Sequence, residues 1–454
     1  MGILHWLRLR LGNKNIRYLV RSSWSVSWPM TIIMFFIFLI GLADVYVAGR
    51  IGKEVQASYG FVSQLYFIFS IIAFALTTGA VSVIARLYTS GRKKDLNIAV
   101  DSSLISAAAS GFVLWLLALV FSGPIINKFG LPEALKDFSV SLMQVYSYGV
   151  LFSYILLNTN GILRACGMIK KSLWTMALVC FLNVVLNFVL AFATPLGFRG
   201  IAFATVISTI VGCVLNVFFL RRVMTGELKF SMPITKKIIG IGWPAGLLQI
   251  FWQLAALALF LILSALPIYN VEILAAFTNG LKIESAIFLP AFAFNLAAAV
   301  VVGNSLGKQN KKDAFFGGIV TAFLGVIIIS CLTLVVILNA YRIASLLSDN
   351  QIVINECARY IRIALIFEPI MAWSVILGGG LNGAGDTKGV MIIIALCVWL
   401  LRIPLSYIFG LYFGFGQIAV WWSMNASIFI QAIFITKRYF ARRWLAHAHA
   451  ELPV

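Results

Sequence analysis

The chain repeats itself: short polar signatures of its first half recur about 218 positions later, each at the end of a long apolar segment. The aligned pairs, at offsets of 215 to 218, are WP at 28–29 and 243–244, KKD at 93–95 and 311–313, GILRACG at 161–167 and GGLNGAG at 379–385, and GFRGIA at 197–202 and GFGQIA at 414–419. Pairs that recur in the same order predict two packed halves of common architecture.

Composition places this repeat in a membrane. The chain is 61% hydrophobic and 11% charged, with a mean hydropathy of +0.99, values outside the range of soluble domains. A span of the bilayer needs about 20 apolar residues. Twelve stretches qualify, six in each repeat: 24–48, 60–86, 97–121, 138–163, 173–194, 200–220, 239–266, 272–302, 314–339, 357–381, 389–411 and 415–436.

An even number of spans per repeat means that both halves enter the membrane from the same side, so the repeats are parallel. The predicted fold is an all-α membrane protein, with twelve transmembrane helices in two pseudo-symmetric six-helix bundles around a central cleft. Its predicted parts are a cytosolic amphipathic segment 1–23, an N-lobe 24–222, a cytosolic linker 223–238, a C-lobe 239–437 and a cytosolic tail 438–454.

The net charge of +20 follows the same topology. Of the 35 Lys and Arg residues, 25 lie on the side of the termini, eight lie on the opposite side, and Lys282 and Arg402 lie within spans. The positive-inside rule then puts both termini in the cytosol. We expect a multi-pass protein of the cytoplasmic (inner) membrane whose basic rim faces lipid headgroups, with no nucleic-acid partner.

Motifs for catalysis are missing. The three histidines lie in the terminal tails, the six cysteines have no metal-binding spacing, and no HExxH, GxSxG or phosphate-loop pattern occurs. The sequence therefore predicts a protein that is not an enzyme and has no cofactor.

Ionisable groups inside spans are costly and mark functional sites. Four such groups fall in the second repeat, namely Lys282, Glu284, Glu368 and Arg402. They have two interpretations: a buried ion-pair cluster that holds the C-lobe together, or a proton relay or substrate contact.

The first repeat carries one acid alone, Asp44, without a basic partner in its spans. A buried carboxylate of this kind must be neutralised by a proton, a cation or a ligand. Asn183 and Asn187, four apart on one helix face, and Thr205 lie at a similar depth. Their oxygens are suited to a small hard cation or a protonated acid, although hydrogen bonds between helices are the alternative role for these three residues.

The residues resemble those of the multidrug and toxin extrusion (MATE) transporters, in the wider group of multidrug, oligosaccharidyl-lipid and polysaccharide exporters. The likeness covers nearly the whole chain, and its motifs are SWP followed by GLADVYVAGRIG, GILRACG, LNVVLNFVL with GFRGIAFAT, KIESAIFLPAFAFNLAAAVVVGNSLG, and GLNGAGDTK with RIPLSY.

The resemblance implies a two-lobe antiporter that exports organic, often cationic compounds against an inward flow of protons or sodium ions. It also implies a coupling site, possible for Na⁺, at Asp44, Asn183, Asn187 and Thr205. The family pattern has a second Asp at the position of Asn187, which favours protons here. Another branch uses C-lobe acids, one of them in its seventh span, which corresponds to 239–266 here, where this chain has only Gln249 and Gln253.

The expected mechanism is alternating access, in which a cation neutralises Asp44 and reshapes the helices around Pro29, a candidate bend. Two other functions stay open: a lipid-linked oligosaccharide flippase of the same superfamily, and a channel or receptor. The expected partners are small organic substrates and membrane lipids, and we expect a monomer. Aromatic residues, Tyr59 among them, are candidates for lining the cleft.

Overall fold

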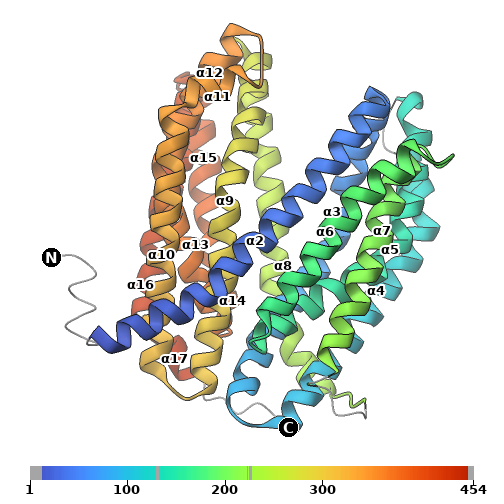
Figure 1. Cartoon of the computed structure of the whole chain (residues 1–454). Coiled ribbons are helices and arrows are strands. Elements are labelled where there is room, and N and C mark those ends of the chain that lie inside the picture. The colour runs from blue at the N-terminus through green and yellow to red at the C-terminus, as the bar shows by residue number, and fades with distance from the viewer. Residues whose placement is uncertain (1–12, 129–131, 222, 224–227, 448–454) are drawn as a thin grey trace. The chain divides into compact units, whose positions relative to one another are not determined.

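The computed structural model describes residues 13–128, 132–221, 223 and 228–447 (Figure 1). These residues form helices and connecting turns, without a strand. The helices are α2 (Asn13–Ile51), α3 (Lys53–Thr89), α4 (Lys93–Lys128), α5 (Glu133–Ala165), α6 (Ile169–Phe192), α7 (Arg199–Leu220), α8 (Met232–Ser264), α9 (Asn270–Gly307), α10 (Lys311–Leu338), α11 (Ala340–Ser345), α12 (Gln351–Ala364), α13 (Glu368–Gly383), α14 (Thr387–Leu396), α15 (Ile403–Tyr407), α16 (Gly416–Phe440) and α17 (Trp444–His447).

In the described part of the chain, twelve segments are long and apolar enough to cross a membrane, which confirms the predicted all-α class. Apolar spans must be helical because lipid offers no hydrogen-bond partner to the backbone. Two of the spans are composite. One joins α12 to α13 through a 3₁₀ turn, η1 (Leu365–Phe367), and the other joins α14 to α15 through a π-helical segment, η2 (Cys397–Arg402), and ends in a second, η3 (Ile408–Tyr412).

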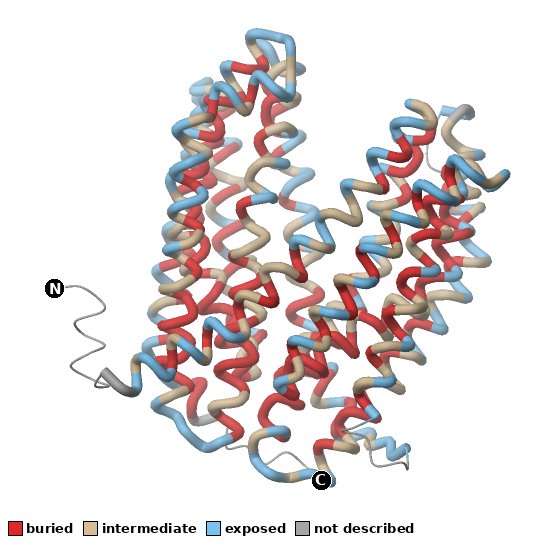
Figure 2. The backbone as a smooth tube through the Cα atoms, viewed as in Figure 1, coloured by how far each residue is buried: buried red, intermediate tan, exposed pale blue. Residues whose placement is uncertain are grey.

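The chain forms two compact units. We name residues 32–246 the N-terminal unit, and residues 13–31 with 247–447 the C-terminal unit. The division falls inside α2 and α8, two residues after Pro29 and Pro244 respectively. Residues 13–23, at the end of the predicted amphipathic segment, continue into the first span as one helix, and residues 1–12 lie outside the described part. Figure 2 shows buried positions along the packed sides of the helices in each unit.

Helix α2 is locally weakened around Pro29. Proline has no N–H to complete the helical ladder, and nearby hydroxyls bond back to main-chain carbonyls: Ser27 Oγ to Ser23 O at 2.8 Å and Thr31 Oγ1 to Ser27 O at 3.1 Å. Such back-bonding often accompanies helix bending.

The repeated glycine signature has a structural cause. Gly167 follows α5 with φ 71°, and Gly385 follows α13 with φ 81°, a left-handed conformation that favours glycine. In both places the next amide N–H donates to the carbonyl five residues back, at 2.8 Å in the first and 2.9 Å in the second. This is the Schellman ending of a helix, so the signature recurs because the same helix stop occurs in each half.

Helix crossings follow the same repeat. Gly379 lets α13 approach α9 closely, since a Cβ there would lie 2.1 Å from the carbonyl oxygen of Asn295. In the N-terminal unit, Gly161 of α5 lies in the same way against Thr77 of α3, whose methyl group would be 2.5 Å from a Cβ. Each residue of the first pair follows its counterpart by 218 positions. Small residues at membrane helix interfaces allow such close contacts.

Gly383→Ala tests this packing. A Cβ at Gly383 would be 2.1 Å from the carbonyl oxygen of Ala299, so α13 and α9 must separate. We expect a loss of roughly 1–3 kcal/mol, typical of overpacking, seen as a lower midpoint of thermal unfolding in detergent. Gly378→Ala is the matched control, because its nearest neighbour is Val390 Cγ1 at 3.4 Å. Equal midpoints for the two variants would contradict the close crossing.

Candidate functional site

A buried polar group surrounds Asp44 in the N-terminal unit. Asp44 of α2 is 3% exposed, Asn183 and Asn187 of α6 are fully buried, and Thr205 of α7 is half-buried. The apolar core around them includes Val47, Ala48, Val62, Ala191, Ile201 and Ala202. Water is therefore displaced by hydrocarbon on most sides of the carboxylate, and its polar partners must come from the helices themselves.

Three side-chain donors reach the Asp44 carboxylate. Asn187 Nδ2 donates to Oδ1 at 2.6 Å, and the hydroxyl of Tyr59, on α3, donates to Oδ2 at 3.2 Å. The Thr205 hydroxyl lies 3.4 Å from Oδ2 and 3.3 Å from the carbonyl oxygen of Ile201, and its one hydrogen serves either acceptor. All of these donors are neutral, and no ion pair of Asp44 occurs within the described residues.

The two asparagines connect the residues around Asp44 to one another through hydrogen bonds. They are four residues apart, so both project from one face of α6. Asn187 Nδ2 also donates to Asn183 Oδ1 at 3.1 Å, and Asn183 Nδ2 donates to Thr205 Oγ1 at 3.0 Å. The Asn187 Oδ1 atom is buried and has no hydrogen-bond partner. An acceptor is therefore available one bond rotation away from Asp44.

This arrangement can accommodate two chemical states. With its amide hydrogens toward Asp44, Asn187 stabilises a bare carboxylate. With the amide turned, its oxygen faces Asp44 and joins those of Asn183 and Thr205, which suits a protonated carboxyl or a small hard cation. An amide can serve both states because it carries a donor and an acceptor, whereas a second carboxylate could only accept.

The structure brings Asp44, Asn183, Asn187 and Thr205 into one hydrogen-bonded group. The sequence analysis considered Tyr59 only as a cleft aromatic and did not foresee its bond to Asp44. Tyr59 is on another helix and no periodicity relates it to Asp44. The one available signal is a hydroxyl-bearing aromatic residue directly before the predicted span 60–86.

The C-terminal unit holds a second group of ionisable side chains, in which Glu368 and Arg402 are buried and Glu284 is half-buried. Glu284 of α9 accepts a hydrogen bond from the Tyr360 hydroxyl of α12. Glu368 begins α13 directly after η1, is 3% exposed, and leaves its Oε2 atom without a partner. Glu284 interacts electrostatically with both Glu368 and Arg402. Lys282, in contrast, is on the exposed side of α9.

Arg402 ends the π-helical segment η2 and is 4% exposed. Its Nε donates to Ser427 Oγ at 2.9 Å, its guanidinium carbon lies 5.2 Å from the ring centroid of Trp252, and its Nη2 has no partner. Among the described residues no ion pair within 4 Å joins Arg402 to Glu284 or Glu368. The two acids and the arginine are therefore neighbours without direct pairing.

The chain was compared with known proteins. The MatE family model matches residues 29–189 and 244–408, one stretch in each half. The transporter YisQ of Bacillus subtilis is 22% identical, with 93% of this chain and 95% of YisQ aligned. Multidrug resistance protein NorM of Burkholderia vietnamiensis is 25% identical, with 90% and 91% aligned.

A solved structure, the outward-facing conformation of a multidrug resistance MATE family transporter of the MOP superfamily, has the same fold. Its TM-score is 0.89 at 21% identity, over 95% of this chain and 97% of that one. The relatives are transporters and not enzymes, and the twelve apolar helices make this chain an integral multi-pass membrane protein. With the family model matched in both halves, the chain belongs to the MatE family, that of the MATE multidrug efflux transporters.

Proposed function

We propose that this transporter exports small organic compounds by alternating access, driven by a proton or sodium ion that binds at Asp44. The observation that carries the proposal is the isolation of Asp44: a buried carboxylate whose partners are all neutral. Such a group binds a cation more favourably than one already paired with lysine or arginine. Family membership supplies the setting of multidrug efflux.

Coupling requires the two transport states to differ in affinity for the cation. The proposed difference is the orientation of Asn187. Its hydrogens favour the bare carboxylate, and its oxygen favours the neutralised one. Neutralisation of Asp44 therefore changes the hydrogen bonds between α2, α3, α6 and α7 at once, and α2 carries this change toward the weakened stretch at Pro29.

A single carboxylate favours the proton as the coupling ion. Sodium prefers several oxygen ligands, and one negative charge with amide and hydroxyl oxygens provides a weak site for it. We further propose a monomer in the cytoplasmic membrane with both termini in the cytosol, from the excess of basic residues on that side.

Asp44→Asn should abolish coupled export. We expect efflux of a fluorescent organic cation from proteoliposomes to follow an imposed pH gradient in the wild type, and to fall to the rate of protein-free liposomes in the variant. The control is Glu133→Gln, which removes an acid from an exposed ion pair with Lys136 at the start of α5. Wild-type efflux by Asp44→Asn would overturn the coupling role. Absence of gradient-driven efflux in the wild type would favour a flippase.

Asn187→Asp should change the ion preference. Two buried acids, four residues apart, repel each other unless a cation lies between them. We expect the variant to gain efflux driven by a sodium gradient and to bind ²²Na⁺ at least about tenfold more tightly than the wild type, equivalent to about 1.4 kcal/mol. Unchanged sodium binding would mean that residue 187 does not contact the cation, and sodium-driven efflux in the wild type would show that the asparagine oxygens already suffice.

For the second group, we propose that Arg402 balances the charge of Glu284 and Glu368, so that the C-terminal unit tolerates these acids.

Arg402→Leu should then lower the free energy of unfolding by roughly 3–5 kcal/mol, because it leaves the acids without a counter-charge. Arg402→Leu combined with Glu368→Gln should recover part of this loss. Ser427→Ala removes only the hydrogen bond to Arg402 and should lose about 1 kcal/mol. If the stability loss of the double variant, measured by thermal unfolding, equals the sum of the losses of Arg402→Leu and Glu368→Gln, charge balance is contradicted.

A further inference from the structure

Helix α9 carries a charged residue on its exposed side, inside a membrane span. This residue is Lys282, and the exposed positions around it have the spacing of one helix face: Thr278, Lys282, Ser285 and Ala286. The exposed positions of α10 between 314 and 338 are apolar, as expected of a surface that contacts lipid: Ile327, Cys331, Leu332, Leu334, Val335 and Leu338. The exposed face of α9 is therefore of a different kind.

The same face occurs in the first repeat without the charge. At the offset of 218 positions, the four exposed positions of α9 correspond to four exposed positions of α3: Gly60, Gln64, Phe67 and Ile68. Lys282 takes the place of the neutral Gln64, so this helix face does not require a cation in order to fold. Ser285 and Ala286 take the places of two large apolar side chains, which leaves more room beside the ammonium group on α9.

The ammonium group of Lys282 has no counter-charge on its own helix. All residues three and four positions away from it are neutral, namely Thr278, Asn279, Ser285 and Ala286. Glu284 is two positions on, so it projects from another side of α9, roughly 200° around the axis, and accepts a hydrogen bond from Tyr360. No ion pair of Lys282 occurs in the part of the chain that the structure describes.

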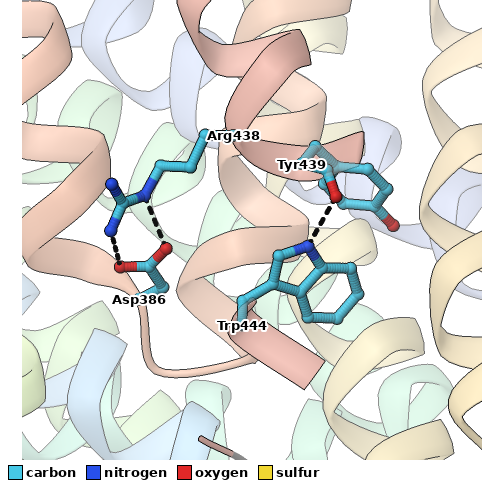
Figure 3. A network of polar contacts seen from close by, with 4 residues as sticks. All are labelled: Asp386, Arg438, Tyr439 and Trp444. Carbon is cyan, nitrogen blue, oxygen red and sulfur yellow. Dashed lines mark hydrogen bonds and ion pairs between the residues drawn. The ribbon is translucent and has the colours of Figure 1, made fainter. Parts of the chain in front are cut away.

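Other basic side chains of the C-terminal unit are neutralised directly. Arg438 Nε and Nη2 donate to the two carboxylate oxygens of Asp386, each at 2.7 Å, a bidentate geometry that Figure 3 shows. Arg359 pairs with Glu356 at 2.7 Å. Lys282 differs from both arginines, because its positive charge is exposed and has no acidic partner.

The depth of Lys282 argues against a lipid headgroup as its counter-charge. Lys282 is ten residues, roughly 15 Å, inside the predicted span 272–302, which is half of a hydrocarbon thickness of ~30 Å. Lipid phosphates lie outside the hydrocarbon, and this depth is too large for a lysine side chain to reach them by snorkelling. Because an ammonium group that faces hydrocarbon is costly, we expect this face of α9 to contact water.

We propose that this face of α9 binds the carboxylate of a transported organic compound, with Lys282 as its counter-charge. The inference rests on the proposed export function and adds a substrate class to it, compounds that carry a carboxylate. Lys282 offers three N–H donors, and the hydroxyl of Ser285, one turn further on, offers another. Hydrogen bonds from a charged donor to a carboxylate are stronger than those between neutral groups. The face therefore favours a carboxylate over its ester.

The test compares two dyes with the same ring system, rhodamine 110, which has a free carboxylate, and rhodamine 123, its methyl ester. Their affinities for the purified transporter in a non-ionic detergent are measured by fluorescence polarisation. Lys282→Gln should weaken binding of rhodamine 110 about tenfold, because it removes a charge-assisted hydrogen bond, and should not weaken binding of rhodamine 123. The variant is expected to fold, since glutamine occupies the corresponding position 64 of α3. Lys308→Gln, which removes an exposed charge just after the end of α9, is the matched control.

Three results overturn the proposal: no binding of rhodamine 110 by the wild type, no loss on Lys282→Gln, or an equal loss for both dyes. Binding needs no ion gradient, so its outcome is separate from that of the proposed export. Efflux of rhodamine 123 driven by a pH gradient, together with any of these three results, would leave the export standing. Binding of rhodamine 110 that depends on Lys282, without efflux of either dye, would contradict the export and not the binding face.

A cysteine at position 285 tests whether water and the dye reach this face. Ser285→Cys is made together with Cys331→Ala, because Cys331 is exposed and the other five cysteines are buried. We expect a charged methanethiosulfonate reagent to modify the new cysteine, and rhodamine 110 to slow this reaction only while Lys282 is present. An unreactive cysteine would show that the face lies against lipid. Protection by phosphatidylglycerol in place of the dye would identify a lipid site, and either result overturns the proposal.

Discussion

Hydrocarbon offers the backbone no hydrogen bonds, and this constraint explains both the regularity of the helices and the places where they depart from it. Spans must satisfy their own N–H and C=O groups, so most are unbroken α-helices. Among the described helices, two of the three departures lie next to buried charge in the C-terminal unit: the 3₁₀ turn η1 ends just before Glu368, and the π-helical segment η2 ends at Arg402. Insertions of this type recur at functional positions in helices, here where a charged side chain must be aimed inward.

The same constraint governs the interior of each unit. The two repeats share two backbone features: the Schellman helix endings at Gly167 and Gly385, and the close helix crossings at Gly161 and Gly379. On this common scaffold the polar interiors differ. One unit surrounds Asp44 with neutral amides and hydroxyls, and the other holds buried Glu368 and Arg402 beside half-buried Glu284. Two halves with the same helix endings and crossings therefore differ in the charges that they hold.

The sequence predicts the parts of this architecture that depend on local periodicity. Apolar length predicted the twelve spans, and the four-residue spacing of Asn183 and Asn187 predicted a shared face, because both follow from helix geometry alone. The sequence does not predict contacts between side chains of different helices, because these depend on how each helix is rotated about its axis. The bond from Tyr59 to Asp44 and the bond from Tyr360 to Glu284 belong to this class, as does the exposed position of Lys282 within a span.

The role of Asn187 shows why one substitution in a buried site changes the chemistry more than its small change in shape suggests. A carboxylate at this position would accept hydrogen bonds only and would add a second negative charge beside Asp44, so the site would be stable mainly with a cation bound. The amide carries no charge and turns a donor toward Asp44 at 2.6 Å, so the carboxylate is hydrogen-bonded without a cation. In the proposed cycle, a proton needs only the rotation of one amide to be accommodated, whereas sodium needs several oxygens turned inward together. On this proposal, the neutral residue lowers the demand for a metal ion and keeps the site able to respond to a proton.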